Sequence, residues 1–121
     1  ELLRAALIRA HMCEKLASGM PSGHSEMAFT VGLFSLLDTL MCAPMEFLLT
    51  HLRLVPEISN ALTRREGPFG PLLDQIIAWE AGELTSERVL PQRIHRLAGV
   101  YLEATQWADQ VYATANEKQA N

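Results

Sequence analysis

The sequence predicts an all-α fold, a compact bundle of about six helices with a buried central helix and a long C-terminal helix. Apolar residues recur at steps of three and four along most of the chain, which is the period of a helix packed by one face. No short run alternates between apolar and polar residues, and the hairpin dipeptides Asn-Gly and Asp-Gly do not occur. With 121 residues, 49% of them hydrophobic, the chain is expected to form a single domain, 1–121.

The first predicted helix begins near the start of the chain and ends at "SGMPSGH", where Gly19, Pro21 and Gly23 interrupt the pattern. Its apolar stripe consists of Leu3, Ala6, Leu7, Ala10, Cys13, Leu16 and Ala17.

The second predicted helix is the most apolar segment of the chain. It begins near Ser22 or Ser25 and runs to about Cys42, and residues 28–37 are apolar nearly all round. Since a helix that is hydrophobic on all sides belongs in the middle of a bundle, we expect it to be the buried central helix. The side chains expected to be buried there are Leu33, Phe34, Leu36 and Leu37.

Prolines and glycines divide the next part of the chain. Pro44 and Pro56 each suit the first turn of a short helix, and the second of these helices ends near Gly67. The segment "REGPFG", residues 65–70, is predicted to be a rigid connector, because a proline disfavours the α conformation of the residue before it.

The last two predicted helices follow this connector. One spans 71–82 and stops at Gly82, and a turn over 85–90 then leads to a long amphipathic helix that starts at Pro91. The polar tail, 116–121, is expected to fray. The stripe of the long helix is Ile94, Leu97, Ala98, Tyr101, Leu102, Thr105, Ala108 and Tyr112.

The sequence argues against two classes of partner, nucleic acids and membranes. The net charge is −4 and Arg64-Arg65 is the only basic pair, whereas nucleic-acid binding needs a basic face. Residues 27–45 are numerous enough to span a membrane, but Asp38 lies inside this stretch and Pro44 breaks it. We therefore expect contact with neither nucleic acid nor membrane.

The two cysteines, Cys13 and Cys42, lie in apolar helical patterns and are expected to be reduced core thiols of a cytoplasmic protein. The chain begins in helical periodicity, without an initiator Met and without the pattern of a signal peptide. We interpret it as a segment of a longer protein.

Candidate chemistry is sparse. No histidine has a second ligand at metal-binding spacing, so His11, His24, His51 and His95 are expected to be isolated surface or core residues. Cys13 and His11 cannot form a nucleophile pair, because residues two apart on a helix point away from each other. Among the carboxylates, Asp38 lies in an apolar helix, and Glu80 and Glu83 are expected to be solvated near a helix end.

Three segments together resemble one known family. "AFTVGLFSLLDTLM" is similar to the central helix of the HDOD family, the non-catalytic relatives of the HD metal-dependent phosphohydrolases. "REGPFGPLLDQIIAWEAGE" and "YLEATQWADQVYAT" resemble two further stretches of it, especially in the form that is fused to an EAL domain. The resemblance implies an HD-domain-like bundle, of which this chain is the C-terminal part. The positions that carry it are Gly32, Ser35, Leu36, Asp38, Arg65, Glu66, Gly67, Pro68, Gly70, Tyr101, Glu103 and Trp107.

The resemblance also implies that the metal site is lost. Active HD enzymes read roughly G-L-L-H-D-I-G in the central helix, which places their metal-binding His and Asp on Ser35 and Leu36, and the family glycine on Asp38. An upstream metal histidine would fall near Ala5. Leucine cannot bind a metal ion and serine is a poor substitute for imidazole, so we expect no metal, no cofactor and no catalysis by this chain.

The function implied is regulation by protein–protein contact inside a larger bacterial protein of cyclic di-GMP or two-component signalling. The partners would be other domains of the same polypeptide, such as an EAL or a receiver domain, with homo-oligomers as a further expectation. Any phosphodiesterase activity would belong to a separate EAL domain. Two alternatives remain open, namely a helical domain with an unrecognised catalytic or metal site, and a simple oligomerisation module.

Trp107 has two interpretations on the sequence alone. It lies off the main stripe of the last helix, so it either caps the core by packing on "REGPFG" near Phe69 or is exposed and anchors a partner. We expect it to be the cap.

Overall fold

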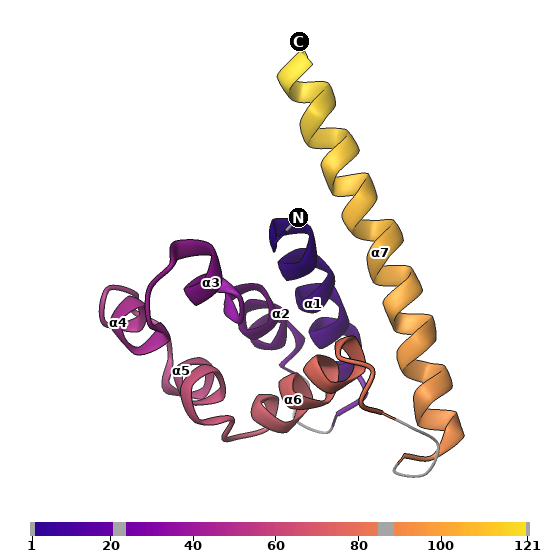
Figure 1. Ribbon diagram of the computed structural model, residues 1–121, viewed down its shortest axis with the longest axis horizontal. Coiled ribbons are helices and arrows are strands. Elements are labelled where there is room, and N and C mark those ends of the chain that lie inside the picture. Colours follow the sequence, from indigo (N-terminus) through magenta and orange to yellow (C-terminus); the bar gives the residue numbers. More distant parts are fainter. Residues whose placement is uncertain (1, 21–23, 85–88, 121) are drawn as a thin grey trace.

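The computed structural model describes residues 2–20, 24–84 and 89–120, with the side chains of 116–120 excepted. These residues form an all-helical bundle, and none of them lies in a strand, which confirms the predicted fold class (Figure 1). The predicted start at Ser22 and most of the turn over 85–90 lie outside the described residues. The helices are α1 (Leu2–Ala17), α2 (Ser25–Phe34), α3 (Leu37–Met41), α4 (Met45–Thr50), α5 (Pro56–Arg64), α6 (Phe69–Glu80) and α7 (Pro91–Ala120).

The central helix is α1. All residues from 8 to 13 are buried, and α1 packs against α2, α6 and α7 (Figure 1). The prediction that the helix from near Ser22 or Ser25 to about Cys42 is the central helix was therefore wrong. Hydropathy could not identify α1, because two of its buried residues are Arg9 and His11, whose burial depends on partners from other helices.

The predicted second helix is two helices. α2 ends at Phe34, the chain turns through Ser35 and Leu36, and α3 follows at an angle. Ser35 contributes to this end, because its hydroxyl donates a hydrogen bond of 2.7 Å to the carbonyl of Gly32. Neither α3 nor α4, both fully described, contains a buried residue.

This break corrects the predicted core. The four side chains expected to be buried are only half-buried, namely Leu33, Phe34, Leu36 and Leu37. Cys42 is exposed rather than in the core, and it ends α3 in the left-handed conformation (φ 53°). Three large apolar side chains of α3 and α4 are exposed as a result, namely Leu40, Met41 and Phe47, whereas Met45 and Leu49 pack against the core.

The connector allows α6 to start earlier than predicted. α6 begins at Phe69, so Gly70 is helical and Pro71 occupies the third helical position. Proline is tolerated there because the first N–H groups of a helix have no partner within the helix. A Cβ atom at Gly70 would lie 2.1 Å from the carbonyl carbon of Arg65, so only glycine fits this contact. The predicted stop is confirmed, since α6 ends at Glu80 and Gly82 adopts a positive φ of 72°.

The long C-terminal helix is confirmed, but its buried stripe is shifted from the predicted one. Leu97, Ala104 and Ala108 are buried, whereas Leu102 is 61% exposed. The backbone of α7 is helical to Ala120 and thus includes most of the polar tail. Among the described residues, no helix is long and apolar enough to cross a membrane.

The two thiols are expected to differ strongly in reactivity. Burial raises the pKa of Cys13 to about 12, whereas Cys42 is exposed. Because the thiolate is the reactive form, a disulfide reagent at pH 8 should rapidly modify Cys42 alone in the folded chain, and both thiols in denaturant. Cys42→Ser should abolish the rapid phase. Rapid modification of Cys13 in the folded Cys42→Ser variant would contradict its burial.

Candidate functional site

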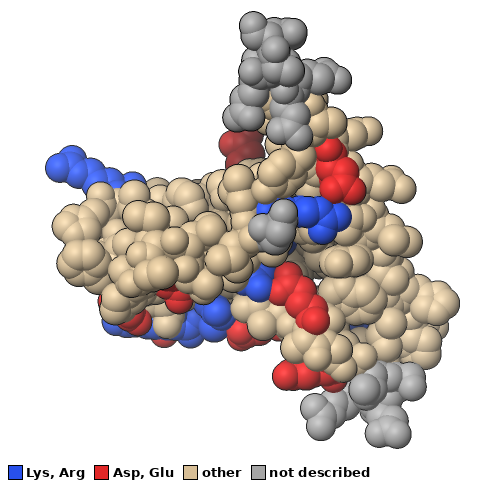
Figure 2. Space-filling view, turned by 45° about the horizontal axis from the view of Figure 1, so that its top comes forward, with Lys and Arg blue, Asp and Glu red and all other residues tan. Residues whose placement is uncertain are grey.

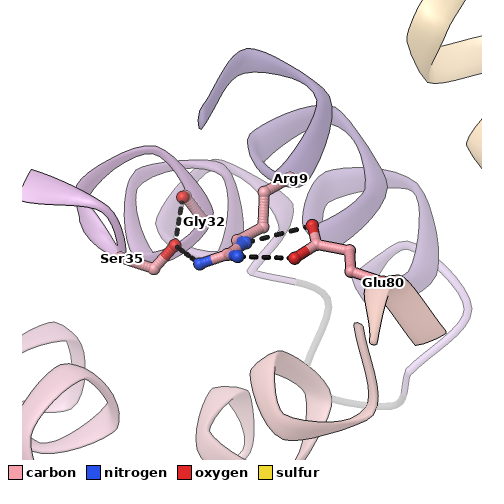
Figure 3. Close-up of polar contacts among 4 residues, drawn as sticks. All are labelled: Arg9, Gly32, Ser35 and Glu80. Atoms are coloured by element: carbon pink, nitrogen blue, oxygen red, sulfur yellow. Dashed lines mark hydrogen bonds and ion pairs between the residues drawn. The ribbon is translucent and has the colours of Figure 1, made fainter. Parts of the chain in front are cut away.

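A buried arginine joins three helices beside the position where the resemblance places a metal ligand (Figure 3). Arg9 on α1 donates from Nη1 to the hydroxyl of Ser35, just after α2, at 3.0 Å. Its Nε donates to Oε2 of Glu80, at the end of α6, at 3.2 Å, and its Nη2 donates to Oε1 of the same carboxylate. This pairing through two hydrogen bonds provides a charged partner for the Arg9 side chain, which is only 10% exposed.

Gly32 brings α1 and α2 close enough for this contact. A Cβ atom at this position would lie 2.7 Å from Cα of Ala10 and 2.7 Å from the carbonyl oxygen of Arg9. Since both neighbours are backbone atoms, a side chain at Gly32 would force the helices apart. Gly32 therefore allows α1 and α2 to lie close enough together for the hydroxyl of Ser35 to accept a hydrogen bond from Arg9.

The predicted site positions near Ser35 do not all converge. Ser35 joins the arginine network, whereas Leu36 is half-buried and has no polar group to contribute. Asp38 is half-buried in the first turn of α3, where its carboxylate accepts the N–H of Thr39 at 2.8 Å. Within the described part of the chain, no three His, Cys, Asp or Glu side chains form a group that could hold a metal ion.

This arrangement has little capacity for chemistry. An arginine side chain is not deprotonated in proteins, so this residue type is no general acid or base. The nearby thiol of Cys13 is held in its neutral form, because burial raises its pKa to about 12 and the Arg9 charge offsets this only in part. The network can fix α1, α2 and α6 in one arrangement, which is a structural task.

A second cluster joins α1 to α7. His11 is buried and stacks on Trp107, with ring centroids 4.9 Å apart and an interplanar angle of 29°. Its Nε2 lies 3.6 Å from a carboxylate oxygen of Glu103 and has no hydrogen-bond partner among the described residues. The Lys15 ammonium, 3.3 Å from the same oxygen, lowers the pKa of the Glu103 carboxyl by hydrogen bonding to it. Phe29 of α2 meets Trp107 edge-on at 6.0 Å.

Trp107 is thus half-buried against the core, but its partners differ from those predicted. It packs on His11 and Phe29 rather than on the connector, because its face of α7 turns toward α1 and α2.

Truncation of this side chain should destabilise the fold. Trp107→Ala is expected to lower the free energy of unfolding by about 3 kcal/mol, through loss of the stacked surface. Leu102→Ala, on the exposed side of the same helix, should change it by less than about 0.5 kcal/mol. Thermal unfolding of both variants provides the measurement. An unchanged melting curve for Trp107→Ala, together with lost association, would identify Trp107 as a partner anchor instead.

The other residues that carry the family resemblance lie at the α5–α6 connection and at the contact between α6 and α7. Arg65 adopts a positive φ of 54° and donates to the carbonyls of Ala61 (3.2 Å) and Leu62 (2.8 Å), which closes the end of α5. The Nε of Arg65 also donates to Asp74 at 2.9 Å.

Tyr101 of α7 meets Trp79 of α6 edge-on, with ring centroids 6.1 Å apart. The other connector positions are the exposed Glu66, Gly67 with a φ of 78°, and Pro68 before the first residue of α6.

Sequence reasoning missed the residues that hold the two clusters together. Arg9 was not singled out, His11 was expected to be isolated, and Glu80 was expected to be merely solvated, although it pairs with Arg9. One signal was available, since Arg9 lies within the apolar run "AALIRAHMC". A charge in such a run needs a partner if it is buried.

Comparison with known proteins found similarity to part of a cyclic di-GMP phosphodiesterase and to part of an uncharacterized protein. No family profile and no solved structure matches the chain. Over 75 residues it is 41% identical to the cyclic di-GMP phosphodiesterase CdgJ of Vibrio cholerae, a stretch that covers 61% of this chain and 17% of that protein. Over 109 residues it is 28% identical to the uncharacterized protein YuxH of Bacillus subtilis, which covers 88% of this chain and 27% of that protein. The chain therefore spans less than a third of the length of either relative.

Proposed function

We propose that this chain is the C-terminal part of an HDOD-like regulatory domain, which acts without catalysis in a cytoplasmic cyclic di-GMP signalling protein. The observation that carries the proposal is the guanidinium of Arg9 on Ser35, the position where the resemblance places a metal histidine. The guanidinium engages both the hydroxyl of Ser35 and the carboxylate of Glu80, so these oxygens serve the arginine rather than a divalent cation. The similarity to part of a cyclic di-GMP phosphodiesterase supports the signalling context.

Contact with other domains of the same polypeptide would be the mode of action. α3 and α4 lie at the opposite end of the molecule from α7 and expose large apolar side chains, among them Met41 (60% exposed) and Phe47 (56%) (Figure 1). An exposed apolar surface of this kind marks an interaction site. The relatives are several times longer than the matched stretch, which supports a neighbouring domain as the occupant.

Binding to nucleic acid is not part of this proposal. On the face shown in Figure 2, acidic and basic side chains lie near one another and neutral side chains predominate. Binding to a phosphate backbone would require a face on which basic side chains predominate.

Two measurements test the catalytic half of the proposal. Elemental analysis of protein purified without chelator should find no stoichiometric iron, manganese or zinc. The variant Ser35→His/Leu36→Asp should gain no phosphohydrolase activity, because Arg9 and the absence of the upstream ligand at Ala5 remain. Stoichiometric metal in the unmodified chain, or hydrolysis of cyclic di-GMP by it, would refute the proposal.

Hydrogen exchange tests the contact. Amides of residues 37–50 should exchange more slowly in a complete polypeptide that contains a neighbouring domain than in the 121-residue chain alone. Met41→Ser/Phe47→Ser should remove this difference, whereas Leu102→Ser, at an exposed position on α7, should not. Equal exchange in both proteins would exclude the contact, and protection that rises with the concentration of the isolated chain would indicate an oligomerisation module instead.

A further inference from the structure

A pocket of about 500 Å³ opens where α1 ends and α6 and α7 begin. This volume lies within the range of pockets that bind small organic molecules. Its apolar walls are Leu16, Met20, Pro68, Pro71, Leu72 and Leu97. Neither the Arg9 network nor the Trp107 cluster contributes to it, so the pocket is separate from the positions considered above.

The polar groups of the pocket favour an anion. Arg93 and Arg96 line it from one face of α7, three residues apart, and Gln75 lines it from α6. No carboxylate is among the described lining residues, although the chain as a whole has a net charge of −4. Asp74, next to Gln75 in the sequence, is engaged by Arg65.

The helix ends add to this charge. The arginines lie in the first two turns of α7, and Pro68 and Pro71 lie at the start of α6, so the positive ends of two helix dipoles meet at the pocket. Gly19 makes room for one guanidinium, since Nη2 of Arg96 lies 3.0 Å from where a Cβ of residue 19 would stand.

From this combination we propose that the pocket binds a small organic anion, with its apolar body against Leu16, Met20 and Leu72 and its charged group between Arg93 and Arg96. Two guanidinium groups match a phosphate, sulfonate or carboxylate, and the apolar walls favour an anion with an apolar body over a bare inorganic ion. This inference is independent of the regulatory function proposed above.

A pair of matched probes tests the proposal on the 121-residue chain. 1-Anilinonaphthalene-8-sulfonate carries an apolar body and one negative charge, and N-phenyl-1-naphthylamine has nearly the same body without the charge. Amide chemical shifts in NMR titrations locate each probe, and fluorescence gives its affinity. We expect the sulfonate to shift the amides of Gly19, Gln75 and Arg96 and to bind about tenfold more tightly than the neutral probe, as one charge-assisted contact allows.

Variants separate the roles of charge and shape. Arg93→Gln and Arg96→Gln should each weaken sulfonate binding by about tenfold and leave the neutral probe unaffected, whereas Arg53→Gln, at an exposed position elsewhere, should change neither. Gly19→Leu should weaken both probes by filling the pocket, and circular dichroism checks that each variant is folded. Unchanged sulfonate affinity in Arg93→Gln and Arg96→Gln, or shifts confined to other residues such as those of α3 and α4, would overturn the proposal.

Competition then identifies the charged group. Displacement of the sulfonate probe by guanosine monophosphate but not by indole-3-acetate would assign a phosphate ligand, and the reverse a carboxylate. Displacement by inorganic phosphate at equal concentration would overturn the requirement for an apolar body.

Discussion

Glu80→Ala is expected to lower the free energy of unfolding by about 3 kcal/mol. The change leaves the guanidinium of Arg9, only 10% exposed, without its carboxylate partner inside the bundle. Removing one partner of a buried ion pair costs about 3–5 kcal/mol, and the lower end applies because the Glu80 side chain is 27% exposed. Urea unfolding followed by circular dichroism measures the loss.

Two further variants show whether burial of the charge is the cause. Asp109→Ala removes the carboxylate of an exposed ion pair with Arg4. It should cost much less than Glu80→Ala, because solvent screens exposed charges. Arg9→Met combined with Glu80→Ala should recover much of the stability that Glu80→Ala loses, because no unpaired charge remains. If Glu80→Ala costs no more than Asp109→Ala, the arginine network does not hold the three helices together.

Gly32→Ala is expected to destabilise the chain by about 3 kcal/mol or more. The added methyl group would meet the backbone of Ala10 and the carbonyl of Arg9 at 2.7 Å, and neither can move without shifting α1. Overpacking that shifts side chains and backbone typically costs about 1–3 kcal/mol and occasionally more, and we expect the upper end because both contacts are with backbone atoms. The shift should also lengthen the contact between Arg9 and Ser35, which hydrogen exchange at the end of α2 would detect as loss of protection.

Gly99→Ala is the matched control, because it makes the same substitution in a helix where the new Cβ has no neighbour within 4 Å. It should stabilise the chain by about 0.5–1 kcal/mol, since alanine favours the helix over glycine. Equal effects of the two substitutions would show that the close approach at Gly32 does not limit packing.

Local patterns predicted most of the helices and several of their ends. Pro56 starts α5, Gly82 follows α6, and Pro91 begins the long last helix, as their backbone preferences require. These features depend on neighbours in the sequence, so hydrophobic period and turn residues are sufficient to find them. The absence of a metal ligand at Ser35 and Leu36 is equally a property of residue type, whereas the contact between Arg9 and Ser35, which carries the functional proposal, is not.

The sequence by itself thus determined an all-α bundle of short helices with a long C-terminal one, whereas tertiary structure alone decided which helix is central. Apolar content favoured the segment 25–42, but α1 occupies the centre, because Glu80 and Ser35 compensate the charge of Arg9 and Trp107 covers His11. The partners of these two side chains lie from 26 to 96 residues away along the chain, so no local pattern reveals them. Tertiary structure likewise decided the position of α3 and α4, because α2, α6 and α7 cover α1 and neither short helix contains a buried residue.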